Sequence, residues 1–179
     1  MRAFIAIEIP KEVRDYLFKI KDNFNRDLVK VNWTAKSRIH LTLKFLGEVH
    51  EKLLLRLIEK LKEIKFNDFE LELENLEVFP NENHAKVLWV GVKNFNKVIE
   101  LQQDIEEKLM DDFEKDKEFS AHITLGRVKV VKDNSKFKMA FRKIKIVKHK
   151  FKVDSFSLIK SELSSAGPKY TTIEKFYSK

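Results

Sequence analysis

The chain contains no cysteine, only four glycines and three prolines, and no long apolar run. The absence of cysteine excludes disulfide bonds, thiol nucleophiles and thiolate metal sites. A membrane-spanning helix needs roughly 18–20 consecutive apolar residues, and no segment approaches that length. The apolar stretch at the N-terminus is too short for a signal peptide and is interrupted by Glu8. We therefore expect a soluble cytoplasmic protein with no membrane partner.

Apolar residues and charge are abundant instead. The 179 residues are 43% hydrophobic and include fifteen Phe, so the chain can bury a real core. The formal net charge is +8, which favours a polyanionic partner such as RNA, DNA or a nucleotide. A solvated, lysine-rich surface without a partner is the alternative. Because Lys and Glu dominate the charged residues, the composition is also typical of a thermophilic protein.

Apolar periodicity divides the chain into strands and helices. The predicted strands are 4–9, 39–48, 69–79, 86–92, 122–131, 151–160 and 170–177, with a short extended piece at 31–34. The predicted helices are 11–24, 52–64, 95–113 and 135–142. The strand at 69–79 alternates apolar and acidic residues, which is typical of a half-exposed antiparallel strand.

An offset of 82 residues relates the two halves of the chain. At this offset His-Leu-Thr-Leu at 40–43 aligns with His-Ile-Thr-Leu at 122–125. The strand at 4–10 aligns with 86–92, and 69–78 aligns with 151–160. An internal repeat of this kind indicates pseudo-two-fold symmetry. We therefore predict a bilobal α+β fold, each lobe a mostly antiparallel sheet with flanking helices, within a single domain spanning 1–179.

The sharpest signal is the pattern His-x-Thr-x, which occurs once in each half. The chain has only five His and five Thr, so a chance repeat of this spacing inside two apolar strands is rare. Residues i and i+2 of a strand project from the same face, so His40 shares a face with Thr42 and His122 with Thr124. Related by a pseudo-two-fold axis, these four polar groups can converge on one concave site.

Two facing imidazoles suit in-line phosphoryl transfer. One removes a proton from the attacking oxygen while the other protonates the leaving oxygen, and an ordinary histidine pKa near 6.5 allows both states. The threonine hydroxyls can donate to the non-bridging phosphate oxygens. For either histidine taken alone, a hydrogen-bonded sheet residue is the alternative. A zinc site would need a third ligand, and none stands at a suitable spacing, so we predict no metal and no cofactor.

The segments HLTLKFLGEV and HITLGRV resemble the paired motifs of the two-histidine phosphoesterase superfamily. The nearest branch is the family of RNA 2′,3′-cyclic phosphodiesterases, also called 2′-5′ RNA ligases, and the resemblance extends over the whole chain. It implies an active-site cleft between the lobes and hydrolysis of an RNA 2′,3′-cyclic phosphate to a 2′-phosphomonoester. It also implies that His40 donates a proton to the leaving 3′ oxygen and that His122 accepts one from water. Run in reverse with a 5′-hydroxyl end, the same chemistry makes a 2′-5′ linkage.

Three further residues are candidate substrate ligands. Lys44 continues the parity of the first histidine and threonine and is predicted to reach the cleft. Arg127 offers a bidentate phosphate contact, with an ordinary surface arginine as the alternative. Its parity is odd, so a bulge or strand end has to bring it onto the face of the histidine. Tyr170 offers stacking on a base, as does Trp33, for which core packing is the favoured role. The remaining histidines are predicted to be surface residues: His50, His84 and His149.

Two other functions stay open at this point. The first is a phosphodiesterase that acts on a small cyclic nucleotide or an ADP-ribose cyclic phosphate. The second is an RNA-binding module that has lost catalysis. The expected partner is RNA with a 2′,3′-cyclic phosphate end, tRNA fragments included, or a cyclic nucleotide. The expected oligomeric state is a monomer.

Overall fold

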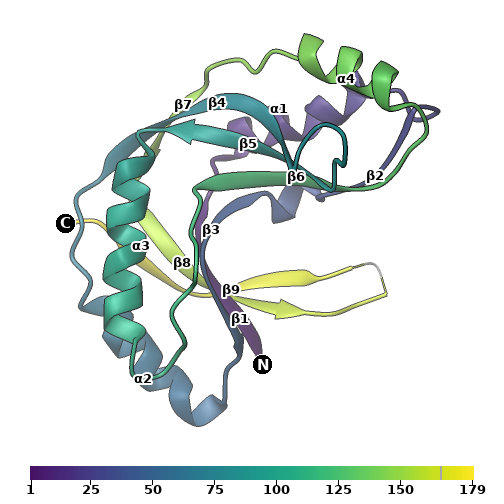
Figure 1. Ribbon diagram of the computed structural model, residues 1–179. Coiled ribbons are helices and arrows are strands. Elements are labelled where there is room, and N and C mark those ends of the chain that lie inside the picture. Colours follow the sequence, from purple (N-terminus) through teal and green to yellow (C-terminus); the bar gives the residue numbers. More distant parts are fainter. Residues whose placement is uncertain (166) are drawn as a thin grey trace.

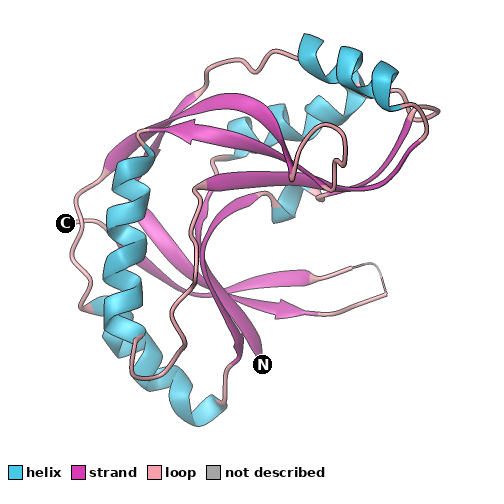
Figure 2. Cartoon of the chain, in the orientation of Figure 1, coloured by secondary structure: helices cyan, strands magenta, loops and turns pink. Residues whose placement is uncertain are grey.

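A computed structural model describes residues 1–165 and 167–179 (Figure 1). The elements follow in the order β1 (Arg2–Glu8), α1 (Lys11–Lys19), a 3-10 turn (Ile20–Asn23), β2 (Val29–Trp33), a second 3-10 turn (Lys36–Arg38), β3 (His40–Glu48), α2 (Glu51–Lys62), β4 (Phe69–Phe79), β5 (Val87–Lys93), α3 (Phe95–Leu109), β6 (His122–Val131), α4 (Asn134–Lys143), β7 (Lys150–Val153), β8 (Ser155–Glu162) and β9 (Lys169–Tyr177). Strands and helices both contribute, which confirms the predicted α+β class (Figure 2).

The strands of the described chain form one curled antiparallel sheet with two lobes. The strand order is β7-β4-β5-β6-β3-β1-β8-β9, and β2 pairs with β6 beside this path. β1, β3, β8 and β9 form the first lobe, and β2, β4, β5, β6 and β7 form the second. The lobes join where β3 meets β6, with Leu41 opposite Ile123. Each histidine motif therefore begins at the junction between the lobes.

The two halves of the repeat exchange strands, which the tandem arrangement did not predict. β4 belongs to the first half of the sequence but pairs with β5 of the second half. β8 belongs to the second half but pairs with β1 of the first. The first strands of the halves are also related by 83 residues rather than 82, because Ala6 lies opposite Thr42 whereas Trp89 lies opposite Thr124. Each lobe thus contains segments from both halves.

The predicted strand at 151–160 is in fact two strands that belong to different lobes. β7 pairs with β4 and places Phe151 opposite Leu71. After Asp154, β8 pairs with β1 and β9. The side chain of Ser155 donates to Asp154 at 2.8 Å at the point where the chain crosses over. A continuous apolar run cannot reveal such a crossover, because both strands bury alternate or successive residues in the same core.

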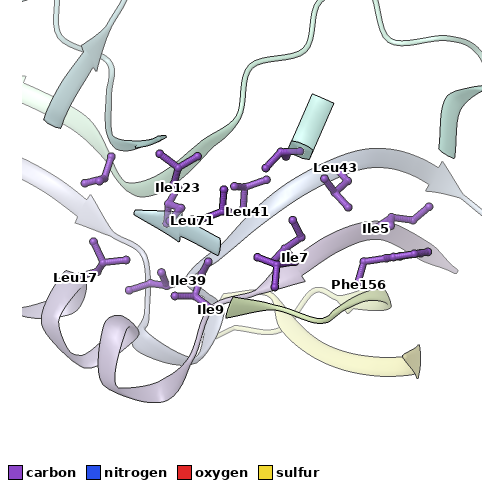
Figure 3. Packing of buried hydrophobic residues seen from close by; sticks show 14 of the residues in the cluster. Ile5, Ile7, Ile9, Leu17, Ile39, Leu41, Leu43, Leu71, Ile123 and Phe156 are labelled. Atoms are coloured by element: carbon purple, nitrogen blue, oxygen red, sulfur yellow. The ribbon is translucent and has the colours of Figure 1, made fainter. Parts of the chain in front are cut away.

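The helices cover the sheet through their apolar faces. α2 and α3 lie along the outer side of the curled sheet in Figure 1, while α1 and α4 lie at the end of the second lobe. Their buried residues recur at three- and four-residue spacing, as the sequence predicted, and include Val13, Leu17, Leu57, Leu61, Val98, Ile105, Leu109, Phe137 and Phe141. Figure 3 shows Leu41 and Leu43 of β3 packed with Ile5 and Ile7 of β1 in this core. No helix in the described residues is long and apolar enough to cross a membrane.

Candidate active site

The first motif strand keeps its predicted alternation only as far as Leu43. His40 and Thr42 are half-buried on one face, while Leu41 and Leu43 are buried in the core. The register then slips, because Ala6 lies opposite Thr42 whereas its neighbour on β1 lies opposite the residue after Leu43. Leu43 is therefore the extra residue of a β-bulge, which reverses the parity of the next residues until a second register shift between Phe45 and Gly47.

The second motif strand has the same irregularity at the equivalent position. Trp89 lies opposite Thr124, but the residue before Trp89 lies opposite Gly126, which makes Leu125 the extra residue. The reversal brings Arg127 onto the face of the histidine and threonine. The bulge that the odd parity of Arg127 required is therefore present.

A cavity of about 330 Å³ opens between the lobes where the two motif strands meet. It is lined by His40, Thr42, His122, Thr124, Arg127, Tyr170, Asn32, Trp33, Thr34, Arg38, Phe45 and Pro168. The structure thus brings together both histidine–threonine pairs and two of the three candidate substrate ligands. The sequence reasoning missed Arg38 and Phe45, among others. The 82-residue offset relates Phe45 to Arg127 and was the one signal available for it.

His40 is held by two hydrogen bonds and two aromatic contacts. Its Nδ1 lies 2.6 Å from the carbonyl oxygen of Arg38, which requires a donor, so the proton is on Nδ1. Its Nε2 lies 2.9 Å from Oγ1 of Thr42. The ring contacts Phe4 at 4.9 Å and Tyr170 at 5.6 Å between centroids. The neutral ring therefore carries its lone pair on Nε2, next to the Thr42 hydroxyl.

Burial lowers the pKa of His40 below its ordinary value of 6.5. Repulsion from a charged His122 lowers this pKa further, while the hydrogen bond to the Arg38 carbonyl opposes the shift. The two imidazoles thus lie close enough for the charge of one to affect the other.

His122 is oriented in the same way by different neighbours. Its Nδ1 lies 2.8 Å from the carbonyl oxygen of Ser120, again two residues earlier in the chain. Its ring contacts Trp89 edge to face, with centroids 5.7 Å apart. In both motifs a backbone acceptor fixes Nδ1 as the protonated atom and leaves Nε2 available for proton transfer.

Lys44 does not line the cavity, so the prediction that it reaches the cleft is wrong. The bulge turns the side chain inward, where only 1% of it is exposed. Its Nζ donates to both carboxylate oxygens of Glu106, at 2.9 and 2.8 Å, and to the carbonyl oxygen of Glu114 at 2.8 Å. Asp116 lies 3.8 Å away, and burial raises the pKa of its carboxyl group. Lys44 therefore ties the strand of His40 to the segment that leads into the strand of His122.

Of the other residues considered from the sequence, Trp33 lies at the cavity and the remaining histidines do not. Trp33 lines the cavity and also packs against Phe24, with ring centroids 5.3 Å apart. The other histidines lie outside the cavity, and His149 instead packs against Tyr16 at 4.5 Å. Within residues 1–165 and 167–179, no group of three or more His, Asp or Glu side chains is placed to hold a metal ion.

The family model described as LigT-like phosphoesterase matches the chain twice, over residues 7–89 and 90–170. The chain belongs to this family. The two matches divide it close to the boundary between the halves of the repeat, which supports the internal duplication.

Two curated relatives match over almost their whole length. An RNA 2′,3′-cyclic phosphodiesterase from Methanocaldococcus jannaschii is 35% identical, with 98% of this chain and all of the relative aligned. One from Archaeoglobus fulgidus is 33% identical over 98% of this chain and 99% of the relative. Sources such as Methanothermobacter thermautotrophicus fit the thermophilic composition.

Solved structures share the fold. A crystal structure of a Thermus thermophilus protein superimposes with a TM-score of 0.79 at 28% identity, over 99% of this chain and 97% of that one. Escherichia coli LigT complexed with 3′-AMP gives a TM-score of 0.78 at 22% identity, over 99% of this chain and 97% of that one. At that identity the likeness of LigT concerns the fold alone.

Proposed function

We propose that the protein hydrolyses RNA 2′,3′-cyclic phosphate ends to 2′-phosphomonoesters. The observation that carries this proposal is the presence of two imidazoles in one cavity, each with Nδ1 tied to a backbone carbonyl and each followed by a threonine on the same face. The curated relatives are named for the same reaction, and the +8 charge suits an RNA substrate.

In the proposed reaction, His122 and His40 act on opposite sides of the phosphorus. Nε2 of His122 takes a proton from water as the water oxygen bonds to phosphorus. The bond from phosphorus to the 3′ oxygen breaks, and protonated His40 gives its Nε2 proton to that oxygen. The 2′ oxygen keeps the phosphate. The step leaves His122 protonated and His40 neutral. Proton exchange with solvent then returns both imidazoles to their starting protonation states.

Thr42, Thr124 and Arg127 are proposed to stabilise charge on the phosphate. All three line the cavity beside the imidazoles. A hydroxyl that donates to a non-bridging oxygen stabilises charge that develops in the transition state, and a guanidinium can make two parallel hydrogen bonds to phosphate. Tyr170 is proposed to contact the nucleoside next to His40, because its ring touches that imidazole.

The lowered pKa of His40 has a consequence for the order of events. An empty cavity favours the neutral ring because burial penalises the charged form. A bound phosphate supplies a negative charge beside the imidazole, which raises the pKa and favours the protonated donor. Substrate binding and proton uptake by His40 are therefore coupled in this mechanism.

The test is incubation of the protein with a cyclic-phosphate-ended RNA in the presence of a chelator. The expected product is a 2′-phosphate, and the phosphate position is read by nuclear magnetic resonance or by resistance to 3′-specific phosphatases. A 3′-phosphate product, or turnover that EDTA abolishes and zinc or magnesium restores, contradicts the mechanism.

The class of substrate is tested through salt. The logarithm of the association constant of a cyclic-phosphate-ended oligonucleotide should fall linearly with the logarithm of the salt concentration. The expected slope is about −0.7 for each phosphate neutralised, and a mononucleotide should show a shallower slope. Equal, flat slopes would favour the small-molecule alternatives, a cyclic nucleotide or an ADP-ribose cyclic phosphate. Binding of RNA without turnover on any cyclic phosphate would favour the RNA-binding module. Ligation, a tRNA-derived substrate, a monomeric state, a cytoplasmic location and a single domain spanning 1–179 remain part of the proposal.

A further inference from the structure

A second cavity of about 270 Å³ lies on the second lobe beside His122. Strands β4 and β5, the start of α3 and the segment at 119–121 form its walls. It shares no lining residue with the first cavity. The mechanism above makes no use of it.

Several residues that line the second cavity are neighbours of His122. Gly91 lies directly opposite His122 in the sheet and lines the cavity. Trp89 also lines it, and its ring meets the His122 ring at 5.7 Å. The cavity wall further includes Ser120, whose carbonyl oxygen accepts the hydrogen bond from Nδ1 of His122. The contact between His122 and Trp89 therefore separates the two cavities.

The lining combines aromatic surfaces with two carboxylates. Trp89, Phe95 and Phe119 supply the aromatic part, and Glu74 and Glu77 supply the carboxylates. Glu77 pairs with Trp89 across the sheet, so the two side chains share a face.

The two carboxylates of this cavity differ from their neighbours on the same strand. Glu70 and Glu72 form ion pairs with Lys150 and Lys93 at 3.2 and 3.1 Å. Glu74 lies near enough to Lys93 for its charge to raise the pKa of that lysine, but in the part of the chain that the structure describes neither Glu74 nor Glu77 forms an ion pair. Free carboxylates repel a phosphate group but accept hydrogen bonds from N–H donors.

We propose that this cavity binds the base of the nucleoside whose 5′ oxygen attacks, or departs from, the phosphorus. The inference rests on the proposed function. In an in-line displacement the attacking and leaving oxygens lie on opposite sides of phosphorus, and His122 serves the attacking side. The cyclic-phosphate nucleoside is attached on the other side, toward His40. A cavity beside His122 therefore lies where a second nucleoside, and not water alone, enters.

The reaction that uses this subsite balances without a further reagent. A 5′-hydroxyl oxygen bonds to phosphorus and gives its proton to His122, while the bond from phosphorus to the 3′ oxygen breaks and that oxygen takes a proton from His40. The products are a 2′-5′ linkage and a free 3′-hydroxyl. Cleavage of the linkage runs the same steps backwards, with the 3′-hydroxyl as the attacking group.

The lining also predicts which base is preferred. Aromatic side chains stack on any base, whereas a carboxylate selects for N–H donors on the base edge. The Watson–Crick edge of guanine presents two adjacent donors, its ring N–H and its amino group, and can engage one carboxylate with both. We therefore expect guanine to be preferred over uracil, which presents one donor.

The experiment compares cleavage of two 2′-5′ dinucleotides that have the same leaving 5′ oxygen. In one the second nucleoside carries guanine, and in the other it is abasic. The wild-type protein should cleave the guanine dinucleotide with a kcat/KM about tenfold higher or more. Phe95→Ala and Glu77→Gln should remove most of this advantage. All three proteins should hydrolyse a 2′,3′-cyclic mononucleotide at rates within about twofold of each other.

Glu70→Gln is the matched control, because Glu70 lies on the same strand as Glu77 but outside the cavity. It should leave the guanine advantage intact. Equal kcat/KM for the two dinucleotides in the wild type overturns the inference, as does an advantage that survives both cavity substitutions. Failure to cleave either dinucleotide, in a protein that hydrolyses the cyclic mononucleotide, overturns it as well. A wild type that hydrolyses no cyclic mononucleotide instead defeats the proposed function itself.

Discussion

The two motif strands have matching backbones and different surroundings. Both carry a bulge directly after the threonine, and both histidines bond a carbonyl two residues earlier. After the bulge, however, the strand of His40 has Lys44 and Phe45, whereas that of His122 has Gly126 and Arg127. The duplication thus preserves the orientation of both imidazoles, while the neighbours of the two histidines differ.

The inward position after the bulge is filled in opposite ways. On β3 it holds Lys44, which reaches to Glu106. On β6 it holds Gly126, where an added Cβ would lie 2.7 Å from Cγ1 of Val31 and 3.2 Å from the backbone oxygen of Asn32. β2 packs too closely for any side chain there. One strand is anchored by a buried ion pair and the other by close backbone contact.

The largest effect is expected from the histidines. His40→Ala and His122→Ala each remove a proton-transfer group and should lower kcat by about 10²–10⁴-fold. The double variant should lose less than the product of the single losses, because the two groups act as a unit. Thr42→Val and Thr124→Val should each lose less than either histidine variant, since the acid–base pair stays intact. Single-turnover rates on a cyclic-phosphate RNA measure these losses, and unchanged RNA affinity separates them from misfolding.

A result in which one histidine variant keeps wild-type turnover would break the symmetry of the proposal. The cavity would then contain one catalytic histidine and one structural copy. Loss of RNA binding in His122→Ala, with no turnover by the wild type on any cyclic phosphate, would instead identify a binding module.

The second effect is on stability. Lys44→Ala leaves the carboxylate of Glu106 buried without its partner, which typically costs about 3–5 kcal/mol. Replacement of both residues by apolar ones, in Lys44→Met with Glu106→Leu, should recover much of this loss. Urea denaturation measures the free energy of unfolding. A Lys44→Ala protein as stable as the wild type would show that the ion pair does not anchor β3.

Lys44 also illustrates where sequence reasoning ended. The alternation of Leu41 and Leu43 correctly placed the first histidine and threonine on one face, because a regular strand has a strict period of two. A bulge adds one residue without a sequence signature in this chain, so the parity of residues beyond Leu43 was predicted wrongly. The same bulge brings Phe45, 70% exposed, into the cavity, a position that only its 82-residue offset from Arg127 could have indicated.

The fold, like the site, was predicted only in part. Periodicity located the strands and helices, and the repeat predicted two lobes. The exchange of β4 and β8 between lobes was not predictable, because pairing partners are chosen by tertiary packing and not by the period of a single strand. For the same reason the segment at 151–160 gave no sign of its crossover at Asp154.

A smaller effect on stability is expected at the glycine. Gly126→Ala forces the Cβ against Val31 and the β2 backbone and should cost about 1–3 kcal/mol. Gly47→Ala is the matched comparison on β3, because no atom lies within 4 Å of its Cβ position but its φ is +66°. That substitution should cost only the strain of a left-handed backbone at an L-residue, about 1 kcal/mol. Thermal unfolding of both variants distinguishes steric from conformational strain, and equal losses would contradict the close approach of β2.

The smallest expected effect is a shift in the pH dependence of turnover, which follows from the pKa of His40. Burial lowers this pKa in the empty cavity from its ordinary value of 6.5. Because proton donation needs the charged ring, kcat/KM should fall as the pH rises through the lowered pKa of His40, which lies below 6.5. Bound phosphate raises the pKa, so the alkaline limb of kcat should lie at higher pH than that of kcat/KM. Tyr170→Ala uncovers the ring that burial now protects, and it should move the alkaline limb of kcat/KM upward. Coincident alkaline limbs for kcat and kcat/KM, unmoved by Tyr170→Ala, would assign the proton donor to a group other than His40.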